Sequence, residues 1–199
     1  MRTAICLLMM YCAIATAAVD NLARNGDFED GLRDWEIRQS EGTVAMMDED
    51  GDDSVKGGTS VFIEIDLAKG VTWHLALFQD NHFLDGNTDY TVAFWAKAEL
   101  PRPVDFYMEL KEDPWTSYGR KTMNLTEEWA EYWSEWTQGP AIPSVWLRFA
   151  VGQIATDFWV DNVRFYEGEY EPDEELGRVQ AVEAGGKLAA LWADLRQRR

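Results

Sequence analysis

The chain has 199 residues, which suffices for one domain with a sizeable core and falls short of two substantial ones. Its formal net charge of −18 disfavours nucleic acid and anionic membranes as partners, because both need a basic face. The aromatic content of 13%, with 10 tryptophans, instead suits a neutral ligand such as a sugar, and the acidity suits a cation such as Ca²⁺.

The first 17 residues have the pattern of a secretory signal peptide. Arg2 provides the positive start, residues 4–15 are apolar but too few to cross a bilayer, and Ala15-Thr16-Ala17 has the small residues of a cleavage site. We therefore expect a secreted, periplasmic or extracellular protein without stable membrane insertion after cleavage; a short uncleaved anchor is the alternative. Both cysteines, Cys6 and Cys12, lie in this segment, so the mature chain is expected to lack disulfides and thiolate metal sites.

From Leu22 to Tyr166, short apolar runs with strand-like patterns alternate with turn-forming residues. Seven of these runs are predicted to be strands, at residues 60–65, 72–78, 90–96, 104–110, 131–136, 145–151 and 157–166. Glycine, proline and asparagine separate them, as in Asp85-Gly86-Asn87 and Gly139-Pro140. Around ten strands of this length, with no helical run between them, indicate an all-β fold, a β-sandwich of two sheets.

Residues 46–53, Met-Met-Asp-Glu-Asp-Gly-Asp-Asp, look like a calcium-binding loop because they are rich in carboxylates. Their glycine comes too early for the helix-loop-helix calcium pattern, and no glutamate stands at the twelfth position. We therefore expect a solvated acidic loop at this place.

The character of the chain changes after the last predicted strand. We expect a β-domain over residues 20–167, an acidic linker over 168–182 and a short amphipathic C-terminal helix over 183–199. The apolar stripe of that helix consists of Leu188, Leu191, Trp192 and Leu195. A helix this short is marginal alone, so it is expected to dock on the sandwich or to bind a protein partner.

Six fragments of the sequence agree in order and spacing with a known family. They lie at residues 25–35, 57–60, 86–98, 125–129, 147–152 and 159–163. With them the chain resembles the 4/9-type carbohydrate-binding modules over most of residues 22–165. The resemblance implies a jelly-roll sandwich that binds a polysaccharide or oligosaccharide and is usually attached to a secreted glycoside hydrolase. The chain departs from the family's pattern at Ala76 and Trp95, which leaves the particular sugar open.

Two acidic motifs bracket the β-region, Asn25-Gly26-Asp27-Phe28-Glu29 and Trp159-Val160-Asp161-Asn162-Val163. If the first and last strands meet, these motifs can share a cation, and Ca²⁺ prefers six to eight oxygen ligands. Similar modules carry a structural calcium there, which implies side-chain ligands from Glu29 and Asp161, a carbonyl from Gly26 and one from residues 56–60. The alternative is that these residues only hydrogen-bond across the sheet.

A sugar-binding sheet should present aromatic and polar side chains on the face opposite the core, because sugar rings stack on flat aromatics while their hydroxyls bond polar groups. Strand alternation predicts that five such side chains share one outward surface: Trp95, Tyr107, Glu109, Trp146 and Arg148. Alternation along residues 72–78, with Trp73 facing inward, adds His74 and Phe78, with Gln79 at the strand end. The loop at 113–118 adds Trp115 and Tyr118.

Catalytic machinery is not apparent in the sequence. No Ser-His-Asp order stands out, the only histidines are His74 and His82, and with 36 acidic residues a carboxylate pair can be drawn anywhere. We therefore expect a binding module rather than an enzyme. The alternatives are an exported structural or adhesion module that makes protein contacts, and a glycoside hydrolase.

Overall fold

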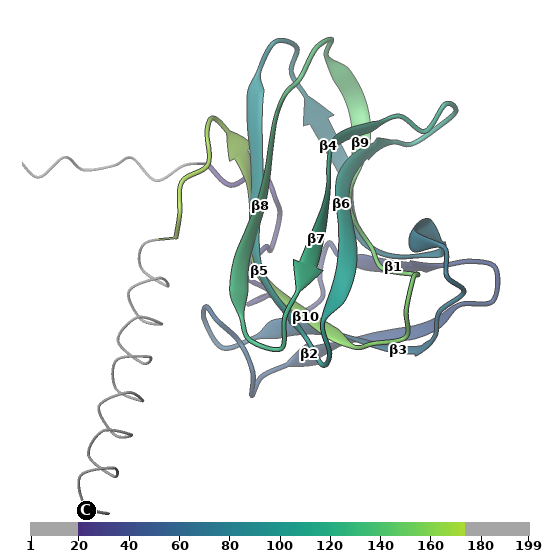
Figure 1. The fold of residues 1–199 in the computed structure, drawn as a ribbon. Coiled ribbons are helices and arrows are strands. Elements are labelled where there is room, and N and C mark those ends of the chain that lie inside the picture. The colour runs from purple at the N-terminus through teal and green to yellow at the C-terminus, as the bar shows by residue number, and fades with distance from the viewer. Residues whose placement is uncertain (1–19, 174–199) are drawn as a thin grey trace, which may run out of the picture.

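The computed structural model describes residues 20–173, which form ten strands in two antiparallel five-stranded sheets packed face to face as a jelly roll (Figure 1). The expected all-β, two-sheet sandwich is therefore confirmed. The predicted signal peptide, the end of the linker and the C-terminal helix lie outside the described residues. Within residues 20–173, no helix is long and apolar enough to cross a membrane.

Sheet A has the strand order β1-β4-β9-β6-β7, and sheet B has the order β2-β3-β10-β5-β8. A single 3₁₀ turn, η1 (Thr72–His74), precedes β4. The strands are β1 (Glu36–Gln39), β2 (Val44–Asp50), β3 (Ser60–Leu67), β4 (Leu75–Leu84), β5 (Asp89–Ala98), β6 (Arg102–Leu110), β7 (Ser117–Leu125), β8 (Ala130–Thr137), β9 (Ile142–Ala150) and β10 (Phe158–Glu167).

The core lies between the sheets and is built from the side chains that alternation places inward. Phe94 of sheet B meets Phe149 of sheet A edge-on, with ring centroids 4.7 Å apart, and Phe106 lies 5.5 Å from Phe149. All three side chains are buried. Packed aromatic pairs of this kind add to the free energy gained by burying their area, so they fix the two sheets against each other.

Strands β1, β2 and β7 were not predicted from the sequence. Strand β2 corrects the expectation of a solvated loop at residues 46–53. Met46 to Asp50, expected as part of a solvated loop, pair with β3 in register from Met46 opposite Glu64 to Asp50 opposite Ser60. The strand lies at the edge of sheet B, where Ala45 and Met47 pack towards the core while Met46 and Asp48 are exposed, so acidic residues are tolerated on the outer face. Trp73 is a second correction, since it lies in η1 and is 56% exposed instead of facing the core.

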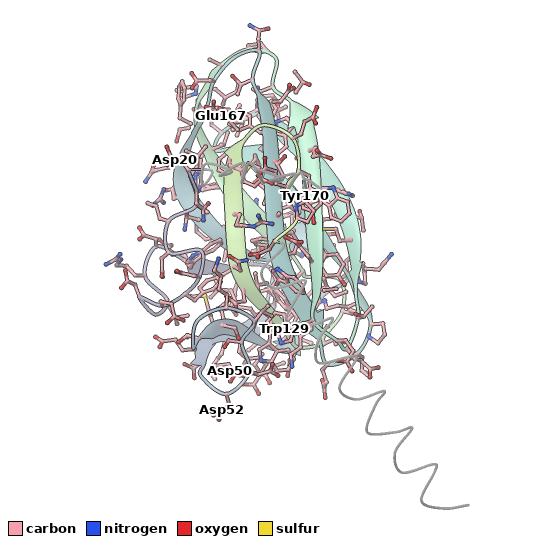
Figure 2. The ribbon with its side chains drawn as sticks, turned by 90° about the vertical axis from the view of Figure 1, so that its left-hand side faces the viewer. Asp20, Asp50, Asp52, Trp129, Glu167 and Tyr170 are labelled. Atoms are coloured by element: carbon pink, nitrogen blue, oxygen red, sulfur yellow. The ribbon has the colours of Figure 1, made fainter. Side chains whose placement is uncertain are left out.

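Residues 168–173, which we call the strap, contact the outer face of sheet B, although Glu169, Glu171 and Pro172 stay exposed. The ring of Tyr170 stacks on Trp133 with centroids 4.2 Å apart and planes 7° apart. The Tyr170 hydroxyl donates to Glu131 over 2.7 Å, and its backbone N–H donates to Glu135 over 2.8 Å. Figure 2 shows Tyr170 lying over the strands of this sheet.

The N-terminal segment joins β10 on the same side of the molecule. The Leu22 N–H donates to the Phe165 carbonyl over 2.6 Å, and the Asn21 side chain bonds both the Val163 carbonyl and the Phe165 N–H. The first and last parts of the described chain are therefore neighbours, as the sequence predicted for the two bracketing motifs. Figure 2 shows Asp20 near Glu167.

Candidate functional site

The outer face of sheet A holds a cavity of about 380 Å³, which we call the cleft. Strands β1, β6 and β9 each contribute one lining side chain, η1 contributes one, and the β6–β7 turn contributes one. They are Arg38, Glu109, Arg148, Trp73 and Trp115. Figure 1 shows the β6–β7 turn projecting beyond the sheet. Trp115 of this turn lines the cleft.

The floor of this face is a small buried cluster separate from the main core, formed by Ala76, Tyr107 and Ala150. Ala76 pairs directly with Ala150 across β4 and β9, so two methyl groups lie where larger side chains would fill the surface. The guanidinium groups of Arg120 and Arg148 lie 5.1 and 5.6 Å from the centre of the Tyr107 ring. Burial raises the pKa of Tyr107, which therefore stays a neutral phenol.

Two ion pairs make the polar part of this face. Arg148 and Glu109 form a pair whose side chains are 5% and 11% exposed. Asp105 accepts a hydrogen bond from Arg120 over 2.7 Å and one from the Thr122 hydroxyl over 2.6 Å. Each charge is held by a partner of the opposite sign, so these groups present hydrogen-bonding atoms in a fixed arrangement.

The walls of the cleft are aromatic, and they remain open to water. Trp73 is 56% exposed and Trp115 is 48% exposed. Trp115 lies nearly parallel to Trp146, with centroids 6.1 Å apart and planes 14° apart, and Trp146 meets the edge of Phe78 at 5.9 Å. The turn that carries Trp115 is closed by its own N–H donating to the Glu112 carbonyl over 2.8 Å. Flat rings held in this way can receive the apolar face of a ligand.

The structure places most of the predicted sugar-binding residues on this face of sheet A. The set comprises Tyr107, Glu109, Trp146, Arg148, Phe78 and Trp115. His74 lies at the rim, where its ring meets Trp73 edge-on at 4.1 Å. Tyr118 does not join them, because it packs against the main core. The sequence reading missed Arg38 and Trp73 as lining residues; Arg38 lies in β1, a strand of four residues that was not predicted.

Trp95 lies on the opposite sheet, so its expected position beside Tyr107 is corrected. It belongs to β5 of sheet B, opposite Asp161 and Glu131, and is 4% exposed. Alternation correctly indicates that Trp95 points away from the core. It carries no information on which of the two sheets a strand joins, because that depends on contacts between strands far apart in sequence.

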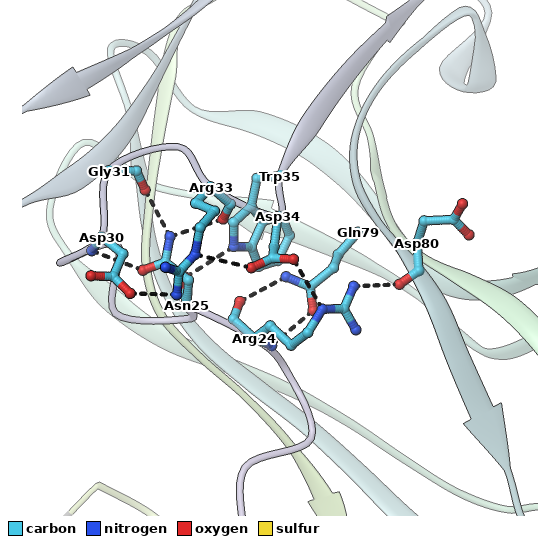
Figure 3. Close-up of polar contacts among 9 residues, drawn as sticks. All are labelled: Arg24, Asn25, Asp30, Gly31, Arg33, Asp34, Trp35, Gln79 and Asp80. Carbon is cyan, nitrogen blue, oxygen red and sulfur yellow. Dashed lines mark hydrogen bonds and ion pairs between the residues drawn. The ribbon is translucent and has the colours of Figure 1, made fainter.

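Gln79 is also displaced from the predicted surface. It is fully buried, and its amide forms two hydrogen bonds with the backbone of Arg24, of 2.8 and 2.7 Å (Figure 3). The Arg24 side chain continues this network to the Asp80 carbonyl over 2.6 Å. Since Phe78 points outward, its neighbour Gln79 points the other way and anchors the N-terminal segment.

The proposed calcium ligands converge on one loop. Glu29 accepts from the Gly58 and Thr59 N–H groups over 2.7 and 3.0 Å, while Asp161 accepts from the Val55 and Lys56 N–H groups over 2.7 and 2.9 Å. Gly26 lies beside β10, where its carbonyl accepts from the Val163 N–H over 2.7 Å. The two bracketing motifs and residues 55–59 therefore meet at the base of sheet B.

The electrostatics of Asp161 suit a cation. Its side chain is fully buried, and burial raises its pKa to about 6, although three backbone N–H donors oppose this effect. The nearby charge of Asp27 raises the pKa further. Within residues 20–173, no group of three or more acidic, histidine or cysteine side chains is gathered as metal ligands. The residues that could hold Ca²⁺ are Glu29, Asp161 and the Gly26 carbonyl, and each of them already accepts a backbone N–H, as the alternative of hydrogen bonds across the sheet expects.

Comparison with known proteins agrees with this architecture. A solved structure described as "CBM4 structure and function" is 29% identical, with a TM-score of 0.62, and the match covers 73% of this chain and 99% of that one. The CBM22-1 xylan-binding domain from Paenibacillus barcinonensis Xyn10C is 15% identical over 79% of this chain and all of that one, with a TM-score of 0.58. A Family 16 Carbohydrate Binding Module-2 is 21% identical over 74% of this chain and all of that one, with a TM-score of 0.51.

The last two similarities, at such low identity, show a shared fold. No curated protein matches the chain in sequence. The sequence pattern of a carbohydrate binding domain family, the 4/9 type, matches residues 20–157, which is more than half of the chain. The chain therefore belongs to the 4/9-type carbohydrate-binding domain family.

Proposed function

We propose that the cleft of sheet A binds a polysaccharide or oligosaccharide, and that the protein is a secreted, extracellular or periplasmic binding module without catalysis of its own. The observation that carries the proposal is the combination of two exposed tryptophans, Trp73 and Trp115, around the ion-paired Arg148 and Glu109 in one cavity. Family membership supports carbohydrate as the ligand class, and the signal-like first 17 residues support export.

The chemistry of the walls and floor matches the two faces of a sugar. Trp73 and Trp115 offer flat rings to the C–H face of a pyranose, and stacking of this kind contributes about 1 kcal/mol per ring beyond area burial. The fixed Arg148–Glu109 pair offers donors and acceptors to hydroxyl groups. The volume of about 380 Å³ falls within the range of roughly 300–1,000 Å³ that is typical of ligand sites.

The acidic residues of this face argue against glycoside hydrolysis. Asp105 and Glu109 are four residues apart in one strand, which separates them by roughly 13 Å, since a strand rises about 3.3 Å per residue. Glycosidases need their two carboxyl groups about 5–9.5 Å apart. Each of the two carboxylates is also held in an ion pair with an arginine.

A structural calcium is part of the proposal. Glu29 and Asp161 would supply carboxylate oxygens, and Gly26 and a residue of the loop at 56–60 would supply carbonyls. Bound there, Ca²⁺ would neutralise a fully buried carboxylate and hold the N-terminal segment, β10 and that loop together. The role is one of stability, because the cleft lies on the other sheet.

The test is affinity electrophoresis and calorimetry of the purified protein against glucans, xylans, mannans and algal polysaccharides. We expect retention on at least one of these glycans, with a roughly fivefold or larger loss of affinity in Trp73→Ala and in Trp115→Ala. Phe83→Ala is the matched control, since Phe83 is 50% exposed and lies outside the cleft.

Three results would contradict the proposal. Retention on no glycan by a folded protein would favour the structural or adhesion alternative, in which residues 183–199 bind a protein partner. Equal losses in Phe83→Ala and Trp115→Ala would mean that the cleft is not the site. Release of reducing sugar from any polysaccharide in the panel would show hydrolysis.

A further inference from the structure

Arg38 stands apart from the other arginines that the structure describes. Five of them pair with a carboxylate: Arg24, Arg33, Arg120, Arg148 and Arg164. Arg102 is buried and donates to the carbonyls of Val151 and Thr156. Within residues 20–173, Arg38 alone among the arginines is exposed and has neither an ion-pair partner nor a hydrogen-bonded acceptor.

The position of Arg38 makes its lack of an ion-pair partner unusual. Arg38 lines the cleft, with its guanidinium carbon 5.6 Å from the centre of the Trp146 ring; that of Arg148 is 5.7 Å from the same ring. Glu109 neutralises Arg148 and leaves the charge of Arg38 unmatched among the lining residues. Glu36 lies two residues earlier on the same face of β1 and is neither ion-paired with Arg38 nor part of the lining. The cleft thus carries local positive charge in a chain of net charge −18.

We propose, resting on the proposed function, that the cleft selects a glycan with an acidic substituent, a carboxylate or a sulfate ester, and that Arg38 receives it. A guanidinium binds either group through two parallel N–H···O bonds, and its charge counts for more beside an aromatic wall than in open water. With a neutral sugar, Arg38 would only donate hydrogen bonds to hydroxyl oxygens, and its positive charge would have no partner of opposite sign.

The overall charge of the protein narrows the class of acidic glycan that could bind. A polymer with an acid on every ring would be repelled by the net charge of −18 before it reached the cleft. A mostly neutral backbone with scattered acidic groups avoids this repulsion and still offers Arg38 a partner. The walls formed by Trp73 and Trp115 would hold the neutral rings, and Arg38 would recognise the substituent.

The experiment compares each acidic polymer with its own neutralised form. Xylan, glucan and galactan chains bearing uronic acids are tested before and after carbodiimide–borohydride reduction, which turns each carboxylate into an alcohol and keeps the backbone. A partly sulfated galactan is tested before and after desulfation. We expect about tenfold weaker binding to the neutralised form of one pair, and that pair identifies carboxylate or sulfate as the source.

Variants assign the effect to Arg38. Arg38→Gln should bind the acidic form about tenfold more weakly than the wild type and should no longer distinguish the two forms, while Arg38→Lys should keep part of the preference. Arg33→Gln, which removes an exposed arginine outside the cleft, should behave as the wild type.

The outcomes separate this inference from the proposed function. If the protein binds glycans equally well before and after neutralisation, the inference fails while the proposed function stands. If the preference survives in Arg38→Gln, Arg38 is not the receiving residue. If no glycan is retained at all, the proposed function fails, and the inference fails with it.

Discussion

The two outer faces of the sandwich both carry tryptophans, but these side chains differ in solvent exposure. On sheet A, Trp73 and Trp115 are 56% and 48% exposed beside an open cavity. On sheet B, Trp95 is 4% exposed and Trp133 lies under the ring of Tyr170. An outward aromatic is therefore open to water on one sheet and packed against the rest of the chain on the other.

The strap on sheet B is held by hydrogen bonds to two carboxylates of β8, Glu131 and Glu135. Glu131 accepts from the Tyr170 hydroxyl, from the Asp173 N–H over 3.3 Å and from the Arg164 guanidinium. On sheet A, the charged groups of the floor pair within the sheet and leave the space above them open. The strap, which follows the last strand, therefore contacts the outer face of sheet B and leaves the outer face of sheet A open.

The largest expected effect contrasts the two kinds of tryptophan. Trp95→Ala should lower the free energy of unfolding by about 4 kcal/mol, because a covered ring is removed and a void is left. Trp115→Ala should change it by less than about 1 kcal/mol, because its ring is half exposed. Urea denaturation measures both. A small loss in Trp95→Ala combined with weakened glycan binding would show that Trp95 contacts ligand after all.

His82 tests how the two sheets are held together as the pH falls. It belongs to β4 of sheet A and meets Phe165 of sheet B at 5.4 Å, and burial lowers its pKa to about 4. The unfolded chain, with a histidine pKa of about 6.5, binds a proton that the folded state excludes. Stability is therefore complete above pH 6.5 and falls towards pH 4, by about 3 kcal/mol from this group.

The measurement compares urea unfolding at pH 7.5 and pH 5 in the wild type and in His82→Gln. The variant should lose less stability between the two pH values than the wild type. An identical loss in both proteins would mean that carboxylates alone account for the acid sensitivity.

Removal of calcium should weaken sheet B and spare the cleft. At free Ca²⁺ of 100 times its dissociation constant, binding stabilises a protein by about 2.7 kcal/mol, so chelator should lower the melting temperature measurably. Asp161→Asn should be insensitive to chelator, whereas Asp52→Asn, an exposed carboxylate, should respond as the wild type does. Glycan affinity measured at a temperature where the apoprotein is folded should not change. Equal melting with calcium and with chelator would argue against the site.

The smallest effect tests the strap. Tyr170→Phe removes the hydrogen bond to Glu131 and keeps the ring on Trp133, so it should cost about 1 kcal/mol of stability. Glycan binding should be unaffected because the cleft lies on the other sheet. Hydrogen exchange at the Tyr170 and Asp173 amides should accelerate. A variant that gains affinity for glycan would instead mean that the strap covers a second binding surface.

Local patterns in the sequence predicted the fold and most of the candidate site. Alternation correctly pointed Tyr107, Glu109 and Arg148 away from the core, because each pattern depends on a single strand, and the pairing of β6 with β9 puts them on one face. Trp95 was misplaced and Arg38 missed for different reasons. Trp95 points outward as predicted, but sheet membership depends on pairing between strands distant in sequence. Arg38 lies in a strand of four residues, too short for a periodic signal.

The contacts of residues 168–173 were the least predictable feature. Their acidic composition suggested solvent exposure, and Glu169, Glu171 and Pro172 are exposed, but the backbone N–H groups of Tyr170 and Asp173 donate to carboxylates on β8. Such a contact depends on the shape of a sheet that is assembled from the whole chain. No local composition contains that information.

The position of residues 20–22 and of the strap beside β10 also bears on how the described part of the chain would carry a mechanical load. Leu22 bonds Phe165 near the end of β10, and Gly168 follows that strand directly. A tension applied between residues 20 and 173 would peel away the strap and then open the N-terminal segment bond by bond, because partners at one end of an antiparallel pair separate in sequence. The force would pass through sheet B, and a glycan bound in the cleft of sheet A would lie outside the path of the force.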